Sequence, residues 1–357
     1  MEEVRLLKGN EAIALAAIRC GVDGYFGYPI TPQSEIMETL MAEKPWETTG
    51  MVCLQAESEV ASIYMVFGGA ACGKKVMTSS SSPGVSLMQE GISVLSGADL
   101  PALIVNVQRG GPGLGTIQPS QSDYFQATKG GGHGDYHLIV LAPYSVQEMA
   151  DFVDLAFTLA FRYRMPAMIL SDGMIGQMME KVVLPPFKPR ATDQEIEKSC
   201  PWALRGKAHT RGQRIASSLE LDPAIMEKQN VERQERYAVV QEREVRCEEY
   251  CCDDAEYLFV AFGSCARLCQ KSVELLRAEG IKAGLLRPIT LWPFPSRILE
   301  GYASRVRSML CVELNSGQMI EDVRLAVNGR VPVIHYGRMG GVVPTPEEIV
   351  EEMKKCL

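Results

Sequence analysis

The sequence lacks the cysteine spacing that usually marks a metal centre. No two of its 11 cysteines form a C-x2-C pair, the spacing that iron–sulfur clusters and structural zinc sites repeatedly use. The nearest approach to a cluster is Cys247, Cys251 and Cys252, followed by Cys265 and Cys269. We therefore expect free thiols in a reducing compartment and no metal ligands in this chain.

Long apolar runs and an excess of positive charge are also missing. No apolar stretch reaches the ~18 residues that cross a bilayer, and the acidic start at residues 1–4 does not resemble a secretory signal. The formal net charge is −8, which argues against nucleic acid or an anionic membrane surface as a partner. These absences predict a folded protein of the cytoplasm.

The length and hydrophobic pattern predict two α/β domains. The chain has 357 residues, which is more than one ordinary core accommodates. Over residues 1–185, short apolar strands alternate with helices, and one helix is expected to open at Thr31 and another to run from about 57 to 72. This alternation predicts a doubly wound parallel sheet with helices on both faces.

The rest of the chain divides into two parts. Residues 186–250 are rich in Glu, Arg and Gln, and we expect a charged linker or excursion that includes an exposed helix. Residues 251–357 return to alternating strands and helices. They predict a smaller α/β domain with a sheet of about four strands.

Four of the predicted strands end in polar residues. Thr31 follows the first strand, Glu57 and Glu59 follow the second, serines at 79–82 follow the third, and Arg109 follows the fourth. Because ligands of open α/β sheets bind at the carboxyl ends of the strands, these loops form a candidate site. Acid, hydroxyls and a cation together suit a small anionic substrate.

Each of these residues also has a purely structural explanation. Thr31 suits a helix cap, a first-turn glutamate is favourable against the helix dipole, the serines suit a polar loop, and Arg109 suits a surface loop. A second glutamate that turned inward would instead be desolvated, with a raised pKa suited to donating a proton.

The glycine-rich stretch after Arg109 does not fit a nucleotide-binding motif. Residues 110–115 fail the G-x-G-x-x-G spacing, and Pro112 removes a backbone donor. His133 and His137 are four residues apart, but the surrounding glycines preclude the helix that would bring two such ligands together. We expect a flexible loop on the substrate side of the site.

These segments resemble the alpha-type subunit of 2-oxoacid:ferredoxin oxidoreductases. The resemblance is strong over residues 5–185, and over 256–357 it is moderate and looks like the transketolase C-terminal type of domain. Gln33, the serine run and residues 118–121 look most like the branched-chain (2-oxoisovalerate) members, with the 2-oxoglutarate members next. The segments that carry the match are Tyr28-Pro29-Ile30-Thr31-Pro32, Gln55-Ala56-Glu57-Ser58-Glu59, Ser81-Ser82-Pro83-Gly84 and Arg109-Gly110-Gly111-Pro112.

The resemblance implies a pyrimidine-type thiamine-diphosphate-binding domain over 1–185. Glu59 corresponds to the glutamate that hydrogen-bonds the pyrimidine ring nitrogen of the cofactor, and Glu57 is the weaker candidate. Thr31 and Arg109 correspond to positions that hold the carboxylate of the substrate. The other positions that match cofactor-binding residues of the family are Tyr28, Pro29, Ser81 and Ser82.

The resemblance also implies that the active site is shared. Thiamine enzymes bind the diphosphate and Mg2+ through a G-D-G motif, and the closest approach here is Ser171-Asp172-Gly173. We therefore expect a beta-type diphosphate-domain subunit with Mg2+, a gamma-type subunit, an iron–sulfur subunit and ferredoxin as partners, besides a possible self-dimer. The complex would convert a branched 2-oxoacid, coenzyme A and oxidised ferredoxin to acyl-CoA, CO2 and reduced ferredoxin. The alternatives are a 2-oxoglutarate-type member, a non-redox transketolase-like subunit and a non-catalytic scaffold.

Overall fold

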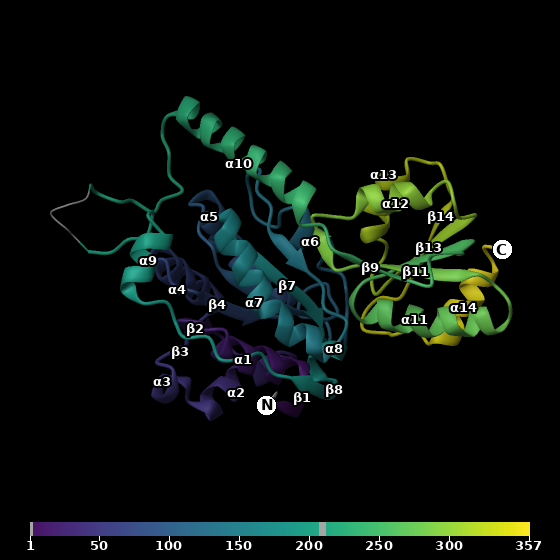
Figure 1. The fold of residues 1–357 in the computed structure, drawn as a ribbon, viewed down its shortest axis with the longest axis horizontal. Helices are drawn as coiled ribbons and strands as arrows, with labels where there is room; N and C mark the ends of the chain where they lie inside the picture. The colour runs from purple at the N-terminus through teal and green to yellow at the C-terminus, as the bar shows by residue number, and fades with distance from the viewer. Residues whose placement is uncertain (1–2, 207–211) are drawn as a thin grey trace.

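The chain forms two sheets that lie side by side along its long axis (Figure 1). The computed structural model describes residues 3–206 and 212–357. The larger sheet has seven strands and the smaller has five, and a separate two-stranded ribbon lies near the N-terminus. None of the helices in these ranges has the length and apolar character that a bilayer span requires.

The seven-stranded sheet has the order β12-β6-β7-β5-β4-β2-β3. Its strands run parallel except β12, which pairs antiparallel with β6. The strands are β2 (Gly24–Gly27), β3 (Val52–Gln55), β4 (Val76–Ser80), β5 (Leu103–Gln108), β6 (Ile139–Leu141), β7 (Ala167–Asp172) and β12 (Thr290–Trp292). Every residue of β4, β5 and β7 is buried, because helices cover both faces. The predicted doubly wound parallel fold is confirmed.

Helices connect these strands and pack in two groups. α1 packs against α2 and α7, whereas α4 packs against α5. The helices of this domain are α1 (Gly9–Arg19), α2 (Ser34–Glu43), α3 (Pro45–Thr48), α4 (Glu59–Ala71), α5 (Ser82–Gly97), α6 (Tyr124–Thr128), α7 (Val146–Tyr163) and α8 (Gly173–Gln177). Two expected helix starts were wrong: the helix placed at Thr31 begins at Ser34, and the one placed at Glu57 begins at Glu59.

The five-stranded sheet has the order β14-β13-β10-β11-β9. Its elements are β9 (Cys247–Tyr250), β10 (Tyr257–Val260), β11 (Ala283–Pro288), β13 (Ser308–Glu313), β14 (Val333–Gly337), α11 (Gly263–Ala278), α12 (Ser296–Tyr302), α13 (Met319–Val327) and α14 (Pro346–Lys354). The sheet therefore has one strand more than the four expected. The additional strand is β9, an antiparallel edge strand whose two glutamates hide its strand character, and it lies within the segment expected to be a linker.

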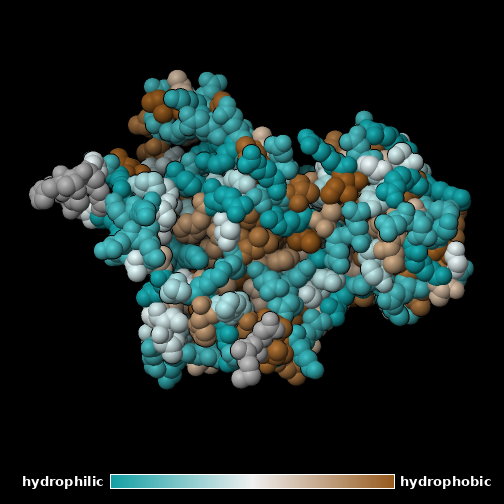
Figure 2. Space-filling model, in the orientation of Figure 1, coloured by the Kyte–Doolittle hydropathy of each residue, from teal (hydrophilic) through white to brown (hydrophobic). Residues whose placement is uncertain are grey.

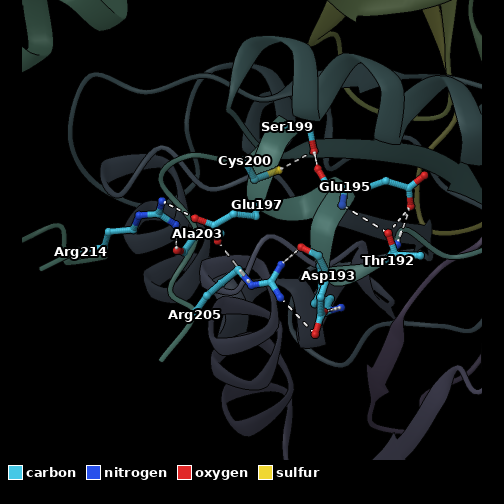
Figure 3. A network of polar contacts seen from close by, with 10 residues as sticks. Thr192, Asp193, Glu195, Glu197, Ser199, Cys200, Ala203, Arg205 and Arg214 are labelled. Carbon is cyan, nitrogen blue, oxygen red and sulfur yellow. Dashed lines mark hydrogen bonds and ion pairs between the residues drawn. The ribbon is translucent and has the colours of Figure 1, made fainter. Parts of the chain in front are cut away.

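The segment between the two sheets packs along the first domain. It starts with β8 (Met179–Val183), which pairs antiparallel with β1 (Val4–Lys8), and continues through α9 (Asp193–Ser199) to α10 (Pro223–Arg243). Around α9, Arg205 pairs with Asp193, and Arg214 pairs with Glu197 (Figure 3). Apolar side chains gather over the first turns of α10 in Figure 2, where several large apolar residues are exposed.

Among the contacts that hold the second domain on the first are a shared sheet and a buried ion pair. β12 comes from the second half of the sequence but extends the first sheet. Arg287 of β11 is 3% exposed and donates from Nη1 and Nη2 to the two carboxylate oxygens of Glu148, each at 2.8 Å. Its guanidinium also lies 3.9 Å from the centre of the Tyr144 ring. The two domains are thus joined by a shared sheet and a buried ion pair.

Candidate active site

The candidate site lies where four neighbouring strands of the larger sheet end. β5, β4, β2 and β3 are adjacent in that order and parallel, so the loops that follow them meet at one edge. The strand ends, loops and first helical residues at this edge carry Thr31, Glu59, the serines at 79–82 and Arg109. The structure therefore brings the predicted residues to the same side of the domain.

Glu59 is the inward-facing carboxylate of the pair considered from the sequence. Ser58 caps α4, and its hydroxyl accepts a hydrogen bond from the Ala61 backbone N–H at 3.2 Å, so the helix begins at Glu59. Glu59 is 7% exposed, whereas Glu57 precedes the helix and is exposed. The Glu59 carboxylate lies against α5. A β-carbon added to Gly84, in the first turn of that helix, would lie 2.7 Å from Glu59 Oε1.

The serines beside Glu59 fall into two classes. Ser79 is satisfied, since its hydroxyl lies 2.7 Å from the hydroxyl of Tyr25 and donates to Gln33 Oε1 at 2.6 Å. Ser80 and Ser81 are fully buried, and neither hydroxyl has a hydrogen-bond partner among the described residues. Unpaired buried hydroxyls are rare in folded proteins and often belong to a ligand site. The hydroxyl of Ser80 adjoins Glu59, because a β-carbon on Gly84 would lie 2.1 Å from it.

Arg109 is held at the carboxyl edge of the sheet by two backbone carbonyls. It is 9% exposed, and its Nη1 and Nη2 donate at 2.9 Å to the backbone carbonyls of Thr31 and Leu114. The two loops therefore hold the side chain at the sheet edge. Its Nε has no partner, and no carboxylate of the described residues pairs with it. A buried cation without a counter-ion suits an anionic ligand.

The loop after β2 lies beside this guanidinium. Thr31 is exposed and does not cap α2, whose N-cap is Gln33. Tyr28 is half-buried and Pro29 is exposed. The carbonyl of Thr31, rather than its hydroxyl, contacts Arg109. Thr31 and Arg109 are therefore neighbours, as the shared sheet edge predicts.

A carboxylate that the sequence did not predict lies next to Ser82. Asp123 Oδ2 accepts hydrogen bonds from Ser82 Oγ at 2.6 Å and from Asn106 Nδ2 at 2.9 Å. Burial raises the pKa of Asp123, and the two donors oppose that shift. Asp123 is 41 residues from Ser82 in the chain, so no local pattern links them.

A cavity of about 720 Å³ opens beside this network, between the two domains. It is bounded by the first turns of α5, by the loop after Arg109 and by the loop after β13. Asp123 is the only charged residue among the described residues that line it. The lining consists of Ser82, Pro83, Ser86, Leu87, Gly111, Pro112, Gly113, Leu114, Ser120, Ser122, Asp123, Leu314, Asn315, Ser316, Gln318, Met339 and Gly340.

The described part of the chain contains no set of side chains arranged to bind a metal ion. No three His, Cys, Asp or Glu side chains there come together to hold an ion. His137 instead stacks on Trp292, with ring centroids 4.6 Å apart, while His133 is exposed. Asp172, the nearest approach to a G-D-G aspartate, caps α8 by accepting from two backbone N–H groups. Both His137 and Asp172 therefore have structural roles.

Comparison with known families covers most of the chain. Residues 15–248 match the family described as pyruvate flavodoxin/ferredoxin oxidoreductase, thiamine diphosphate-binding. Residues 255–349 match the pyruvate:ferredoxin oxidoreductase core domain II.

Two curated relatives align with this chain over nearly their whole length. The chain is 48% identical over 351 residues to the ketoisovalerate oxidoreductase subunit VorB of Methanothermobacter marburgensis, covering 98% of this chain and 97% of that protein. It is 36% identical to the 2-oxoglutarate synthase subunit KorA of Archaeoglobus fulgidus, covering 98% of each.

Solved structures share the same arrangement. The 2-oxoglutarate:ferredoxin oxidoreductase from Magnetococcus marinus, determined with 2-oxoglutarate, coenzyme A and succinyl-CoA bound, superposes with a TM-score of 0.88 at 28% identity. The match covers 99% of this chain but 65% of that one, so the chain spans about two thirds of that longer polypeptide. A split-gene transketolase in an inactive tetrameric form has a TM-score of 0.62 at 13% identity, a likeness of fold alone.

Proposed function

The chain belongs to the pyruvate flavodoxin/ferredoxin oxidoreductase family of thiamine-diphosphate-binding subunits, and from this we propose that it serves a branched-chain 2-oxoacid:ferredoxin oxidoreductase. The complex oxidatively decarboxylates 2-oxoisovalerate with coenzyme A and oxidised ferredoxin, and releases acyl-CoA, CO2 and reduced ferredoxin. The single observation that carries this choice is the 48% identity to a ketoisovalerate oxidoreductase subunit, against 36% to a 2-oxoglutarate synthase subunit.

Glu59 is our candidate for the residue that activates the cofactor. Thiamine diphosphate, when bound, supplies the nucleophilic carbon and the electron sink for decarboxylation. Glu59 holds a proton in a hydrogen bond to the pyrimidine ring nitrogen, and its burial against Gly84 keeps the carboxylate oriented. The unpaired hydroxyls of Ser80 and Ser81 support the fit, because a polar ring would satisfy them.

The remaining residues that we assign to the cofactor surround Glu59. We assign contacts with the pyrimidine end of the cofactor to Tyr28, Pro29, Ser81 and Ser82. They lie on the loops after β2 and β4, which are neighbouring strands. This arrangement supports one continuous surface for a flat ring.

Arg109 and Thr31 are our candidates for binding the substrate carboxylate. The guanidinium now donates to two backbone carbonyls, which are weaker acceptors than a carboxylate. Its Nε is unpaired, and the exposed Thr31 lies beside it. The carboxylate of a 2-oxoacid would therefore gain charge-assisted hydrogen bonds from Arg109.

Partner subunits complete the active site in this proposal. The sequence has no G-D-G motif, and Asp172 already caps a helix. We assign the diphosphate and Mg2+ to a beta-type subunit and the iron–sulfur clusters to a ferredoxin-like subunit, with a gamma-type subunit as a further member. The edge strand β3 pairs on one side only within the described residues, and apolar side chains are exposed around it. They are Val52 and Leu54 of β3 and Val60 and Tyr64 of the following helix α4.

The proposal is tested by purifying the complex with its co-expressed partner subunits. We expect bound thiamine diphosphate and a reduction of ferredoxin that requires both 2-oxoisovalerate and coenzyme A. The isolated chain should be inactive, and 2-oxoglutarate should give a lower kcat/KM. A heteromer without thiamine, turnover by the isolated chain, or a preference for 2-oxoglutarate would each contradict the proposal.

A further inference from the structure

We propose that Asp123 is a positioning residue that holds Arg109 in the geometry needed to grip the substrate carboxylate. The inference rests on the proposed role of Arg109. Asp123 itself does not contact the guanidinium. It acts through Ser82, which bonds the Arg109 backbone, and through the loop that joins Arg109 to Asp123.

The side chain of Asp123 connects the start of α5 with the end of β5. Its Oδ2 accepts from Ser82 Oγ at 2.6 Å, and the same hydroxyl oxygen accepts from the Arg109 backbone N–H at 3.1 Å. Asn106 of β5 donates to Asp123 Oδ2 at 2.9 Å. One carboxylate oxygen therefore fixes the N-terminus of α5 against the end of β5, where Arg109 begins its loop.

The backbone of Asp123 fixes the other end of that loop. Its N–H donates to Gln108 Oε1 at 3.0 Å, and Gln108 Nε2 donates in turn to the Ser171 carbonyl at 3.1 Å. The loop thus leaves β5 at Arg109 and returns beside Gln108. Leu114, whose carbonyl accepts from Arg109 Nη2, lies in the middle of it.

The donors of the network are buried, although Ser82 and Asp123 also border the cavity between the domains. Ser82 is 9% exposed and Asn106 is fully buried, with its own Oδ1 already unpaired. Removing the carboxylate would leave the Asn106 amide without its acceptor, and the Ser82 hydroxyl with only the more distant Arg109 carbonyl, at 3.2 Å. These groups would then seek other partners, and the end of β5 and the Leu114 loop would shift together.

Such a shift affects substrate binding more than cofactor activation. The Arg109 guanidinium would lose the Leu114 carbonyl, one of the two that orient it. Its binding of the substrate carboxylate would weaken equally in the ground state and in the transition state, and KM would rise. Glu59 begins a different element, α4, and none of the described hydrogen bonds links it to Asp123. The two roles are therefore separable by kinetics.

The test uses Asp123→Ala and Asp123→Asn in the assembled complex. Asp123→Ala should raise KM for 2-oxoisovalerate by about 10- to 100-fold, the loss expected for hydrogen bonds to a charged group. The KM for coenzyme A should stay unchanged, and kcat at saturating thiamine diphosphate should change far less than the KM for 2-oxoisovalerate. Asp123→Asn keeps an acceptor for Ser82 and should recover most of the loss. Hydrogen exchange over residues 110–122 should quicken in Asp123→Ala only.

A matched control and a second variant keep the outcomes distinct. Asp135→Asn removes an exposed acid from the neighbouring glycine-rich loop and should alter none of these readouts. Ser82→Ala combined with Asp123→Ala should give less than the sum of the two single effects, because both break one path. If Asp123→Ala fails to fold, Asp123→Ser, which keeps a polar group but loses the carboxylate, decides the question by the same KM and exchange criteria.

Two results would overturn the inference, and one would instead overturn its premise. Unchanged KM and exchange in Asp123→Ala would remove the positioning role, and a fall in kcat at constant KM would assign Asp123 to the chemical step. If Arg109→Lys leaves the 2-oxoacid KM unchanged, then the proposed role of Arg109 fails. If Arg109→Lys raises KM and Asp123→Ala does not, only the present inference fails.

Discussion

Glu59 packs directly against the backbone of Gly84, so that a β-carbon at position 84 would lie 2.7 Å from Glu59 Oε1. The same added carbon would lie 2.1 Å from the Ser80 hydroxyl. Because real β-carbons do not approach other heavy atoms this closely, only glycine fits here without displacing one of these groups. The first turn of α5 therefore packs against the Glu59 carboxylate and restricts its orientation.

A substitution at Gly84 should disturb cofactor binding. Gly84→Ala should push Glu59 or Ser80 aside, destabilise the fold by about 1–3 kcal/mol, and reduce the thiamine content of the purified complex. Thermal unfolding and cofactor analysis measure the two effects. Gly68→Ala is the control, because nothing lies within 4 Å of its added β-carbon in α4. It should be neutral or slightly stabilising. Equal thiamine contents in the two variants would contradict this picture.

The buried ion pair between the domains should matter for stability. Arg287→Met leaves Glu148 without its bidentate partner, and breaking a buried pair in this way typically costs about 3–5 kcal/mol. Urea unfolding measures the loss. Arg307→Met is the control, since Arg307 is 68% exposed and pairs with Glu256 at the surface. It should change stability by less than about 1 kcal/mol. A loss no larger than that of the control would show that Arg287 does not join the domains.

The stacked His137 predicts a pH dependence. Burial lowers the pKa of His137, which lies between Trp292 and the edge of Tyr237. The unfolded chain, with an ordinary His pKa of about 6.5, then binds more protons than the folded chain. The free energy of unfolding should fall as the pH drops below about 6.5. Unfolding at a series of pH values, compared with His137→Gln, isolates this slope. Identical slopes in both proteins would exclude His137 as the cause.

The local sequence is sufficient to predict those site residues that follow a strand of the parallel sheet. Thr31, Glu59 and Arg109 come directly after parallel strands, so strand order alone brings their loops together. The choice of Glu59 over Glu57 came from resemblance, and the structure adds a reason, because Ser58 rather than an earlier residue caps α4.

Features that depend on long-range pairing were not predicted. β12 has three residues and joins a sheet whose other strands lie about 120 or more residues earlier, which no local period encodes. β9 carries two glutamates and lacks an apolar alternation. Asp123 is distant in sequence from Ser82, and only the folded loop brings the two together. Each of these features belongs to tertiary structure rather than to the local pattern.

The central claim is that the Glu59 carboxylate activates the cofactor from a fixed, buried position. The most direct test is the rate of hydrogen exchange at the reactive C2 carbon of thiamine in the assembled complex, with Glu59→Gln compared with Glu57→Gln. We predict that Glu59→Gln slows this exchange and the turnover by on the order of 100-fold or more, whereas the exposed Glu57→Gln matches the unmodified complex. Exchange in Glu59→Gln at the unmodified rate, with thiamine still bound, would contradict the account.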